Sequence, residues 1–509
     1  MTSQWKRLTD KAAAVQGRRI LDLFDDGRAR TFSARLDDML LDYSKTNIDH
    51  ETLDLLLEIA TTADVATRRD AMFAGARINE TEGRAVLHTA LRNLADPVIL
   101  DGVDVTGPVR ATHARMQTFA RDLRAGRFQG QGGAITDVVN IGIGGSDLGP
   151  AMAVLALAPY ADGPRCHFVS NIDGAHVHDV LAGLNPETTL VIVASKTFTT
   201  IETMTNAASA LKWLADNGVA DPGGRVVALT AAPDKAVEWG VDETRVLPFP
   251  ESVGGRYSLF SSIGFPVALA VGMDEFREML AGAKAVDDHF RATEGRANAP
   301  LLAAFADQYY TRLRGCQARA VFAYDERLSL LPDYLQQLEM ESNGKSVTVS
   351  GEPVEGPTAA VTWGGVGTDG QHAVFQLLHQ GTHLIPVDFI ASIAPGDQLD
   401  PAHHRTLLMN CLAQGAALMA GKASEDPARA YAGDRPSTTF LLDDCDAAAL
   451  GALIAFHEQR TFANAVLMGI NPFDQFGVEL GKAIAQQIDS GEGSFDPSTQ
   501  ALMAAAGLA

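Results

Sequence analysis

Residues 137–158 read DVVNIGIGGSDLGPAMAVLALA. The apolar run at 137–143 predicts a strand, and residues 146–158 predict the helix that follows it. Between them, the glycines of 141–146 (I-G-I-G-G-S) allow the backbone to approach a ligand closely, and the helix start offers unpaired N–H groups. The spacing matches neither G-x-G-x-x-G nor the P-loop, so it favours a general phosphate site over a nucleotide site. A tight strand-to-helix turn that binds nothing is equally compatible with this stretch.

The same alternation of strands and helices continues along the chain. The first group of predicted elements comprises strands at 166–170, 190–194 and 225–229 and a helix at 201–213. The second group comprises strands at 318–323 and 384–389 and a helix at 332–342. Strands that alternate with helices form parallel sheets. The sequence therefore predicts an α/β protein with two parallel-sheet units, a helical N-terminal segment over residues 1–105, and a short helix after a connector at 489–497.

Composition and charge restrict the possible partners. The chain has 509 residues and a formal net charge of −22. This length exceeds that of a typical single domain, so two domains are expected. An acidic chain repels nucleic acid and anionic membranes, which argues against both as partners. If the substrate is an anion, its site must be locally positive.

Cysteine usage and the N-terminus indicate the compartment. The four cysteines, Cys166, Cys316, Cys411 and Cys445, form no C-x-x-C pair and are typical of free thiols in a reducing compartment. Residues 1–30 are charged throughout and lack the apolar core of a signal peptide. No apolar run approaches the roughly 18 residues of a membrane span. We therefore expect a cytoplasmic protein.

A second candidate anion site lies at residues 195–200, S-K-T-F-T-T, again between a predicted strand and a predicted helix. The hydroxyls and the ammonium of Ser195, Lys196, Thr197 and Thr200 suit phosphate oxygens. Such residues also cap helices, although a cap requires only one hydroxyl. Both candidate turns follow parallel strands at the carboxyl edge, where such sheets bind ligands. If the two strands are neighbours, both turns face one ligand.

Two further stretches supply a cation and a carboxylate. In residues 254–258, G-G-R-Y-S, paired glycines position Arg256, which could stabilise a developing oxyanion or form a structural salt bridge. In residues 336–345, Q-Q-L-E-M-E-S-N-G-K, Gln337 and Glu341 are four apart and share a helical face. Glu341 lies at the predicted helix end, where the dipole disfavours a carboxylate and so suits a proton acceptor. An exposed helical glutamate is the commoner explanation of such a residue.

The histidines do not predict a metal site. His372 ends the loop sequence G-T-D-G-Q-H at 367–372, and His379 follows two turns later. His379 and His383 are four apart, but Gly381 between them is expected to end the helix that would align them. No zinc-type spacing accompanies either histidine.

One C-terminal stretch carries a helical spacing of polar residues. Gln475, Glu479 and Lys482 stand at i, i+4 and i+7, which would place them on one face of a helix. A solvated, salt-bridged face is the usual meaning of this spacing.

Together and in this order, these stretches resemble the glucose-6-phosphate isomerase family. The most specific motifs are V-G-G-R-Y-S at 253–258 and F-D-Q-x-G-V-E-x-x-K at 473–482. The segments I-G-I-G-G-S-D-L-G-P, S-K-T-F-T-T, M-E-S-N-G-K and G-Q-H-A also match, so the resemblance runs from Ile141 to Lys482. Asp369 stands where relatives carry an asparagine.

The resemblance implies two SIS-type α/β domains and a homodimer with active sites at the interface. The larger domain would comprise residues 1–106 and 267–509, with helical N- and C-terminal segments, and the smaller would comprise 107–266. The residue matching His372 comes from the partner subunit in this family. No metal and no cofactor are implied, because exchanging an aldose for a ketose changes no net oxidation state.

The resemblance also assigns roles to residues. The phosphate-binding residues would be Ser195, Lys196, Thr197 and Thr200, with Gly145 and Ser146 on the sugar side. Glu341 would move a proton between C1 and C2, and Arg256 would stabilise the cis-enediolate. His372 and Lys482 would open the sugar ring, and Gln337 and Gln475 would orient the substrate. The implied reaction is the interconversion of glucose 6-phosphate and fructose 6-phosphate in glycolysis and gluconeogenesis.

Three alternatives remain open at the level of sequence. A non-catalytic sugar-phosphate sensor would need the phosphate turns but not Glu341, His372 and Lys482 together. An isomerase of broader specificity would also accept mannose 6-phosphate. A dehydrogenase would use the glycine-rich turn to bind a dinucleotide.

Overall fold

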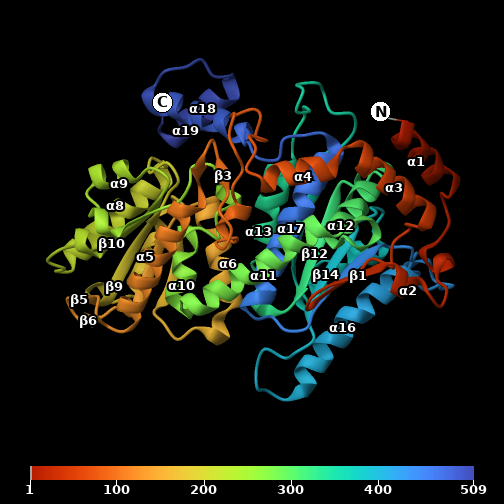
Figure 1. Ribbon diagram of the computed structural model, residues 1–509, viewed down its shortest axis with the longest axis horizontal. Coiled ribbons are helices and arrows are strands. Elements are labelled where there is room, and N and C mark those ends of the chain that lie inside the picture. Colours follow the sequence, from red (N-terminus) through yellow and green to blue (C-terminus); the bar gives the residue numbers. More distant parts are fainter. Residues whose placement is uncertain (1–2, 509) are drawn as a thin grey trace. The chain divides into compact units, whose positions relative to one another are not determined.

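The computed structural model describes residues 3–508 of the chain (Figure 1). The chain divides into two compact units, Met1–Pro472 and Phe473–Ala509. The first unit contains both large sheets, and the second contains α18 (Glu479–Ser490) and α19 (Pro497–Ala506). In the described residues, no helix combines the length and the apolar character needed to cross a membrane.

The first sheet has five parallel strands in the order β11-β10-β9-β7-β8. Their bounds are β7 (Asp137–Ile141), β8 (Arg165–Val169), β9 (Thr189–Ala194), β10 (Val226–Thr230) and β11 (Val246–Pro248). Every residue of β7, β9 and β10 is buried. Such continuous apolar burial is typical of parallel strands that are covered on both faces.

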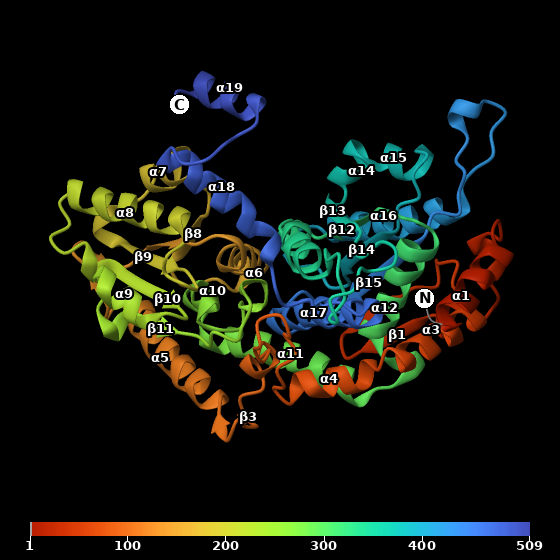
Figure 2. The ribbon, with the colours of Figure 1, turned by 90° about the horizontal axis from the view of Figure 1, so that it is seen from above.

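Helices cover both faces of this sheet. The helices α7 (Gly174–Ala182), α8 (Ile201–Asp216) and α9 (Pro233–Trp239) share one hydrophobic core with the strands. The helices α5 (Thr106–Arg124) and α10 (Phe265–Val271) contact each other and the strands as well, and Figure 2 shows α8 and α5 on opposite sides of the sheet. The chain reaches β8 through α6 (Leu148–Ala156).

The second sheet has six strands in the order β1-β2-β15-β14-β12-β13. Their bounds are β1 (Ser33–Leu36), β2 (Met39–Asp42), β12 (Ala318–Tyr324), β13 (Val361–Val366), β14 (Val387–Ser392) and β15 (Ser437–Leu442). The four strands β12 to β15 are parallel, whereas β2 joins β15 antiparallel and β1 joins β2 antiparallel. The N-terminal segment thus extends a sheet that is otherwise built from residues after 317.

Helices also cover the second sheet on two sides. The helices α15 (Phe375–Gln380) and α16 (Pro401–Ala420) share a core with β12 and β14. Figure 2 shows α16 and α17 (Ala447–Met468) on opposite sides of β14, and α17 packs along α11 (Met273–Ala292) and α12 (Ala299–Gln308).

The remaining elements are short or peripheral. The other α-helices are α1 (Ser3–Ala14), α2 (Arg28–Thr31), α3 (His50–Thr62), α4 (Val65–Phe73), α13 (Leu331–Leu335) and α14 (Asp369–Ala373). Two small hairpins are formed by β3 (Ile99–Leu100) with β4 (Val103–Asp104) and by β5 (Gln129–Gly130) with β6 (Gly133–Ala134).

The structure confirms the α/β class and the parallel character of both sheets. All four cysteines are free, as predicted. The expectation of a wholly helical segment over residues 1–105 is wrong, because β1 and β2 lie within it. Leu36, Met39 and Leu41 are buried; Met39 and Leu41 lie on β2, which pairs with β15, and Leu36 lies on β1, which pairs with β2. Tertiary packing therefore overrides the helix-forming composition. The proposed domain boundaries at 106/107 and 266/267 stay a prediction.

Candidate active site

The glycine-rich turn after β7 packs against two other segments. Gly144 has a φ of +60°, and a Cβ there would lie 2.9 Å from Nε2 of Gln337. A Cβ on Gly145 would lie 1.9 Å from the carbonyl oxygen of Gly255. The positive φ favours glycine at position 144, and at position 145 any side chain would displace the backbone of Gly255. The turn, Gly255 and Gln337 therefore form one contiguous group.

Ser146 and Asp147 complete this turn. Ser146 is buried, and its carbonyl oxygen accepts a hydrogen bond from Nδ2 of Asn140 at 3.0 Å. Burial raises the pKa of Asp147 to about 6, against the opposing effect of a hydrogen bond with Ser170. A carboxylate next to the glycine turn is thus held in surroundings that disfavour its charge.

The hydroxyl-rich turn follows β9, which is the direct neighbour of β7 in the sheet. Ser195 is buried, and its Oγ accepts from the backbone N–H of Phe198 at 3.1 Å and donates to Oγ1 of Thr200 at 3.3 Å. Phe198 has a φ of +53°, which is uncommon for a residue other than glycine. Thr197 is exposed, and Thr200 is the residue that precedes α8. The glycine-rich turn and the hydroxyl-rich turn therefore follow neighbouring parallel strands at the same edge of the sheet, which is the arrangement predicted for binding one ligand.

Lys196 connects this turn to the segment that carries Arg256. Its Nζ donates to the carbonyl oxygen of Val253 at 3.0 Å. Burial lowers the pKa of Lys196, and the positive charges of Arg84 and Arg256 lower it further. Lys196, Arg84 and Arg256 thus lie close enough to repel one another, and the carboxylates of Glu82 and Glu251, which pair with Arg84, partly offset that repulsion.

Arg256 links the two turns to Glu341. The guanidinium is buried, and its Nε donates to Oγ of Ser342 at 2.7 Å. A second guanidinium nitrogen donates to the carbonyl oxygen of Pro472 at 2.5 Å, and a third lies 3.5 Å from Oε2 of Glu341. Oγ of Ser342 also lies 2.8 Å from the Tyr257 hydroxyl. The side chain of Glu341 is 22% exposed, so its carboxylate remains accessible beside a buried cation.

Glu341 and Gln337 lie on a π-helix rather than an α-helix. The α13 helix ends at Leu335, and the backbone continues as a π-helix over Gln336–Glu341. Here we call the segment Gln336–Glu341 the π-turn. Such π-helical turns are rare and occur often at functional sites. The α-helical spacing expected for Gln337 and Glu341 is therefore wrong in detail, although one segment carries both side chains to the site.

Comparison with known proteins gives the family. A family model described as phosphoglucose isomerase matches residues 42–503. The chain belongs to this family. Glucose-6-phosphate isomerases from Erythrobacter litoralis (strain HTCC2594) and Novosphingobium aromaticivorans are each 60% identical to this chain. The first comparison covers 100% of this chain and 99% of the relative, and the second covers 96% of each.

A solved structure agrees with this assignment. The crystal structure of a glucose-6-phosphate isomerase from Chlamydia trachomatis D/UW-3/Cx matches with a TM-score of 0.91 and 30% sequence identity. The match covers 100% of this chain and 99% of that chain. The phosphoglucose isomerase fold therefore spans the full length of the chain.

His372 stands apart from the residues described above. It lies on α14, its side chain is exposed, and within residues 3–508 its ring has no hydrogen-bond partner. By contrast, Nε2 of His379 lies 2.9 Å from Oε1 of Gln414 in a half-buried position. As expected, α15 ends before Gly381. The role that the phosphoglucose isomerase family implies for His372 stays a prediction.

Gln475 and Lys482 lie in the second compact unit. The predicted helical face is wrong, because a 3-10 turn (Phe476–Val478) follows Gln475 and α18 begins only at Glu479. Lys482 lies in the first turns of α18. Their roles in a phosphoglucose isomerase site also stay predictions.

Sequence reasoning missed the residues that hold Arg256. Ser342 directly follows Glu341, yet its hydroxyl bonds to the guanidinium and to Tyr257. A small polar residue at a helix end is normally explained by capping, so its position gave no distinct signal. The phosphoglucose isomerase motifs V-G-G-R-Y-S and M-E-S-N-G-K contain both residues, and this adjacency was the only clue. Within residues 3–508, no three His, Cys, Asp or Glu side chains gather as metal ligands.

Proposed function

We propose that this chain catalyses the reversible isomerisation of glucose 6-phosphate to fructose 6-phosphate, in glycolysis and gluconeogenesis. Membership of the phosphoglucose isomerase family supports the reaction, and relatives at 60% identity carry the name glucose-6-phosphate isomerase. The observation that carries the proposal is the 3.5 Å contact between Arg256 and Glu341, beside the two turns of the first sheet. This contact supports the proposal, because proton transfer through an enediolate requires a base next to a cation.

The substrate phosphate would bind at the hydroxyl-rich turn. Its proposed ligands are Ser195, Lys196, Thr197 and Thr200, together with N–H groups at the start of α8. Helix N-termini and charged donors suit phosphate oxygens. The sugar would extend toward Gly145 and Ser146, because the glycine-rich turn lies on the neighbouring strand.

Proton transfer would follow ring opening. Glu341 would remove the proton from C2 of the open-chain aldose, which leaves a cis-enediolate whose charge lies on its oxygens. Arg256 would stabilise that charge, and Glu341 would return the proton to C1 while a hydroxyl proton moves from O2 to O1. The product is the ketose, and no electron acceptor is consumed. A fixed cation at a developing oxyanion is effective because it needs no reorganisation during the reaction.

Ring opening would use residues outside this group. His372 and Lys482 would act on the ring oxygen and the C1 hydroxyl, and Gln337 and Gln475 would orient the sugar. The exposed position of His372 suits a residue that completes the site of a second copy of the chain. We therefore propose a cytoplasmic homodimer with shared active sites.

A coupled assay tests the function directly. The purified chain is expected to convert fructose 6-phosphate to glucose 6-phosphate at an undiminished rate after treatment with a chelator. Binding of fructose 6-phosphate without conversion would instead favour a sensor. Loss of the rate on chelation would contradict the metal-free mechanism. Mannose 6-phosphate in the same assay measures substrate breadth.

A further inference from the structure

Besides Gln337 and Glu341, the π-turn carries a glutamate whose side chain is directed toward the second sheet. Glu339 lies between Gln337 and Glu341 in sequence, and its side chain is 13% exposed. Its Oε2 accepts hydrogen bonds from Arg319 on β12 and from Oγ1 of Thr362 on β13, the latter at 2.7 Å. The π-turn is thus anchored at its middle to two neighbouring strands.

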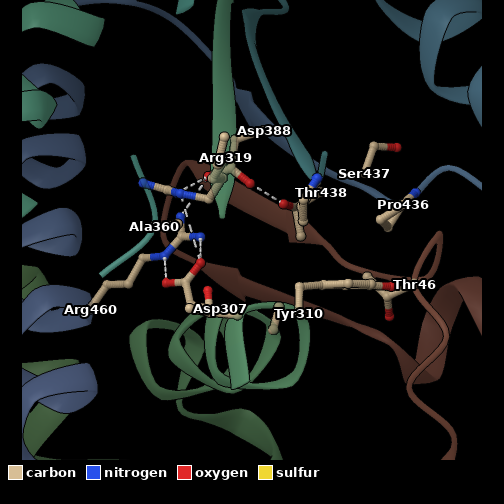
Figure 3. A pocket seen from close by; sticks show the side chains of 14 residues that line it. Thr46, Asp307, Tyr310, Arg319, Ala360, Asp388, Pro436, Ser437, Thr438 and Arg460 are labelled. Carbon is tan, nitrogen blue, oxygen red and sulfur yellow. Dashed lines mark hydrogen bonds and ion pairs between the residues drawn. The ribbon is translucent and has the colours of Figure 1, made fainter. Parts of the chain in front are cut away.

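Arg319 is itself fixed by a buried network of charges. It also pairs with Asp388 on β14, and Asp388 lies 2.7 Å from Arg460 on α17. Arg460 in turn binds both carboxylate oxygens of Asp307 on α12, at 2.7 and 2.6 Å. Figure 3 shows these side chains converging from different elements around one narrow pocket. Glu339 is therefore attached to a framework that spans the sheet and two helices.

Nearby positive charges keep the carboxylate of Glu339 ionised and paired with Arg319. Burial alone would raise the pKa of Glu339, but the positive charges of Arg319 and Arg460 and the neighbouring His457 hold it well below its usual range. Buried charges are tolerated only when they are paired and hydrogen-bonded, so removing a partner is costly. The carboxylate thus stays ionised and bound at any pH at which the enzyme would work.

The side chains of Gln337 and Glu341, on either side of Glu339 in the sequence, make contacts with the candidate active site. Gln337 reaches the glycine-rich turn at Gly144, and Glu341 faces Arg256. A π-helix competes with the commoner α-helical geometry, which would rotate Glu341 relative to Gln337. An anchor at Glu339 opposes that rotation.

We propose that Glu339, held by Arg319 and Thr362, is a positioning residue that sets the alignment of Glu341 for proton transfer. The proposal rests on the isomerase function proposed above. It predicts that loosening the anchor lowers kcat while leaving substrate affinity almost unchanged, because the phosphate turns lie on the other sheet. Misplacement of a reacting group by about 1 Å can cost about 10²-fold in rate.

The network offers a matched pair of variants. Thr362 and Thr438 are both buried, and each donates its hydroxyl to a carboxylate of the same network. Thr362 binds Glu339 on the π-turn, whereas Thr438 binds Asp388 and does not touch it. Both Thr362→Val and Thr438→Val leave a buried carboxylate with one donor fewer, so similar losses of thermal stability are expected.

The two variants are expected to differ in catalysis. We expect Thr362→Val to lower kcat by about 5- to 50-fold with KM within 2-fold of the parent, and Thr362→Ser to restore it. Thr438→Val is expected to keep kcat within 2-fold. Equal kcat losses in both valine variants, or none in Thr362→Val, would overturn the proposal. An inactive parent chain would instead overturn the proposed function, so the two failures are distinguishable.

Hydrogen exchange gives a readout that does not depend on turnover. Backbone amides over residues 336–342 are expected to exchange faster in Thr362→Val and in Glu339→Gln than in the parent, and unchanged in Thr438→Val. Equal exchange over these residues in all four proteins would overturn the proposal, even if the activities differed.

Discussion

The two sheets contribute to the site in different ways. The three inner strands of the first sheet, β7, β9 and β10, are wholly buried, and this sheet contributes to the site through the turns at the carboxyl ends of β7 and β9. The second sheet carries charged residues in its strands, Arg319 and Asp388, and it contributes the end of a helix that holds Glu341. The candidate anion site at the first sheet is thus formed by backbone and hydroxyl groups. At the second sheet, a network of buried ion pairs holds the segment that carries the candidate base, Glu341.

The pKa shifts of two buried carboxylates, Asp147 and Glu339, illustrate the difference between the two sheets. Near the first sheet, burial raises the pKa of Asp147 to about 6. At the second sheet, burial acts on Glu339 in the same direction, but the positive charge of Arg319 outweighs it and the pKa is lowered. The charge of a buried acid therefore depends on whether a cation pairs with it. Arg319 on β12 pairs with Glu339, and in the first sheet Arg165 on β8 likewise pairs with the buried Asp137 and lowers its pKa.

A substitution at Lys196 tests whether the hydroxyl-rich turn of the first sheet binds the substrate phosphate. Removing the ammonium in Lys196→Ala is expected to lower kcat/KM about 10- to 100-fold, mostly through KM, because a charge-assisted bond to phosphate is lost. Steady-state kinetics with fructose 6-phosphate measure the effect. Lys235→Ala, at an exposed position of α9 in the same unit, is the control and should be near the parent. A loss confined to kcat would contradict a phosphate-binding role.

The parts of the site that the first sheet contributes were easier to predict from the sequence than those held by the second sheet. The turns at 141–146 and 195–200 could be predicted because glycines, hydroxyls and flanking apolar strands lie within a few residues of each other. The contact between Arg256 and Glu341 joins residues far apart in sequence, so only the family resemblance suggested it. Glu339 was passed over because its partners, Arg319 and Thr362, come from two separate strands.

The fold was predictable in its class and less so in its details. Continuous apolar runs indicated β7, β9 and β10, since strands buried on both faces leave that pattern. The hairpin β1–β2 was missed because its residues are compatible with a helix, and they form strands because β2 pairs with β15 and β1 pairs with β2. The π-turn could not be predicted from the sequence either, because no local residue pattern distinguishes a π-helix from an α-helix.

The close packing of the glycine turn can be tested with a single methyl group. Gly145→Ala would place a Cβ 1.9 Å from the carbonyl oxygen of Gly255 and so displace the segment that carries Arg256. We expect kcat/KM to fall at least about 10-fold and stability to fall by about 1–3 kcal/mol, as for other overpacked sites. Gly183→Ala, where a Cβ meets nothing within 4 Å, is the matched control. An unchanged Gly145→Ala enzyme would show that the turn and the Arg256 segment are not in contact.

The smallest effect concerns Asp147 and the pH dependence of stability. Its pKa in the folded chain, about 6, lies above the ordinary value of 3.8, so the folded state holds the proton more tightly. The stability that this proton contributes is present below pH 4 and is lost as the pH rises to 6. Asp147→Asn is therefore expected to raise the free energy of unfolding at pH 7 by about 1–3 kcal/mol, with a smaller gain at pH 4.5. Urea unfolding at both pH values measures it, and a gain that grows toward low pH would contradict the assignment.

The most direct measurement follows solvent deuterium into the sugar. In D₂O the parent enzyme is expected to introduce deuterium at C2 of glucose 6-phosphate, because the abstracted proton on Glu341 exchanges with solvent before it returns. Glu341→Gln should bind the sugar phosphate with near-parent affinity but slow both exchange and isomerisation by about 10²–10⁴-fold. Exchange and turnover at the parent rate in Glu341→Gln would contradict the account, since the proton would then be moved by another group.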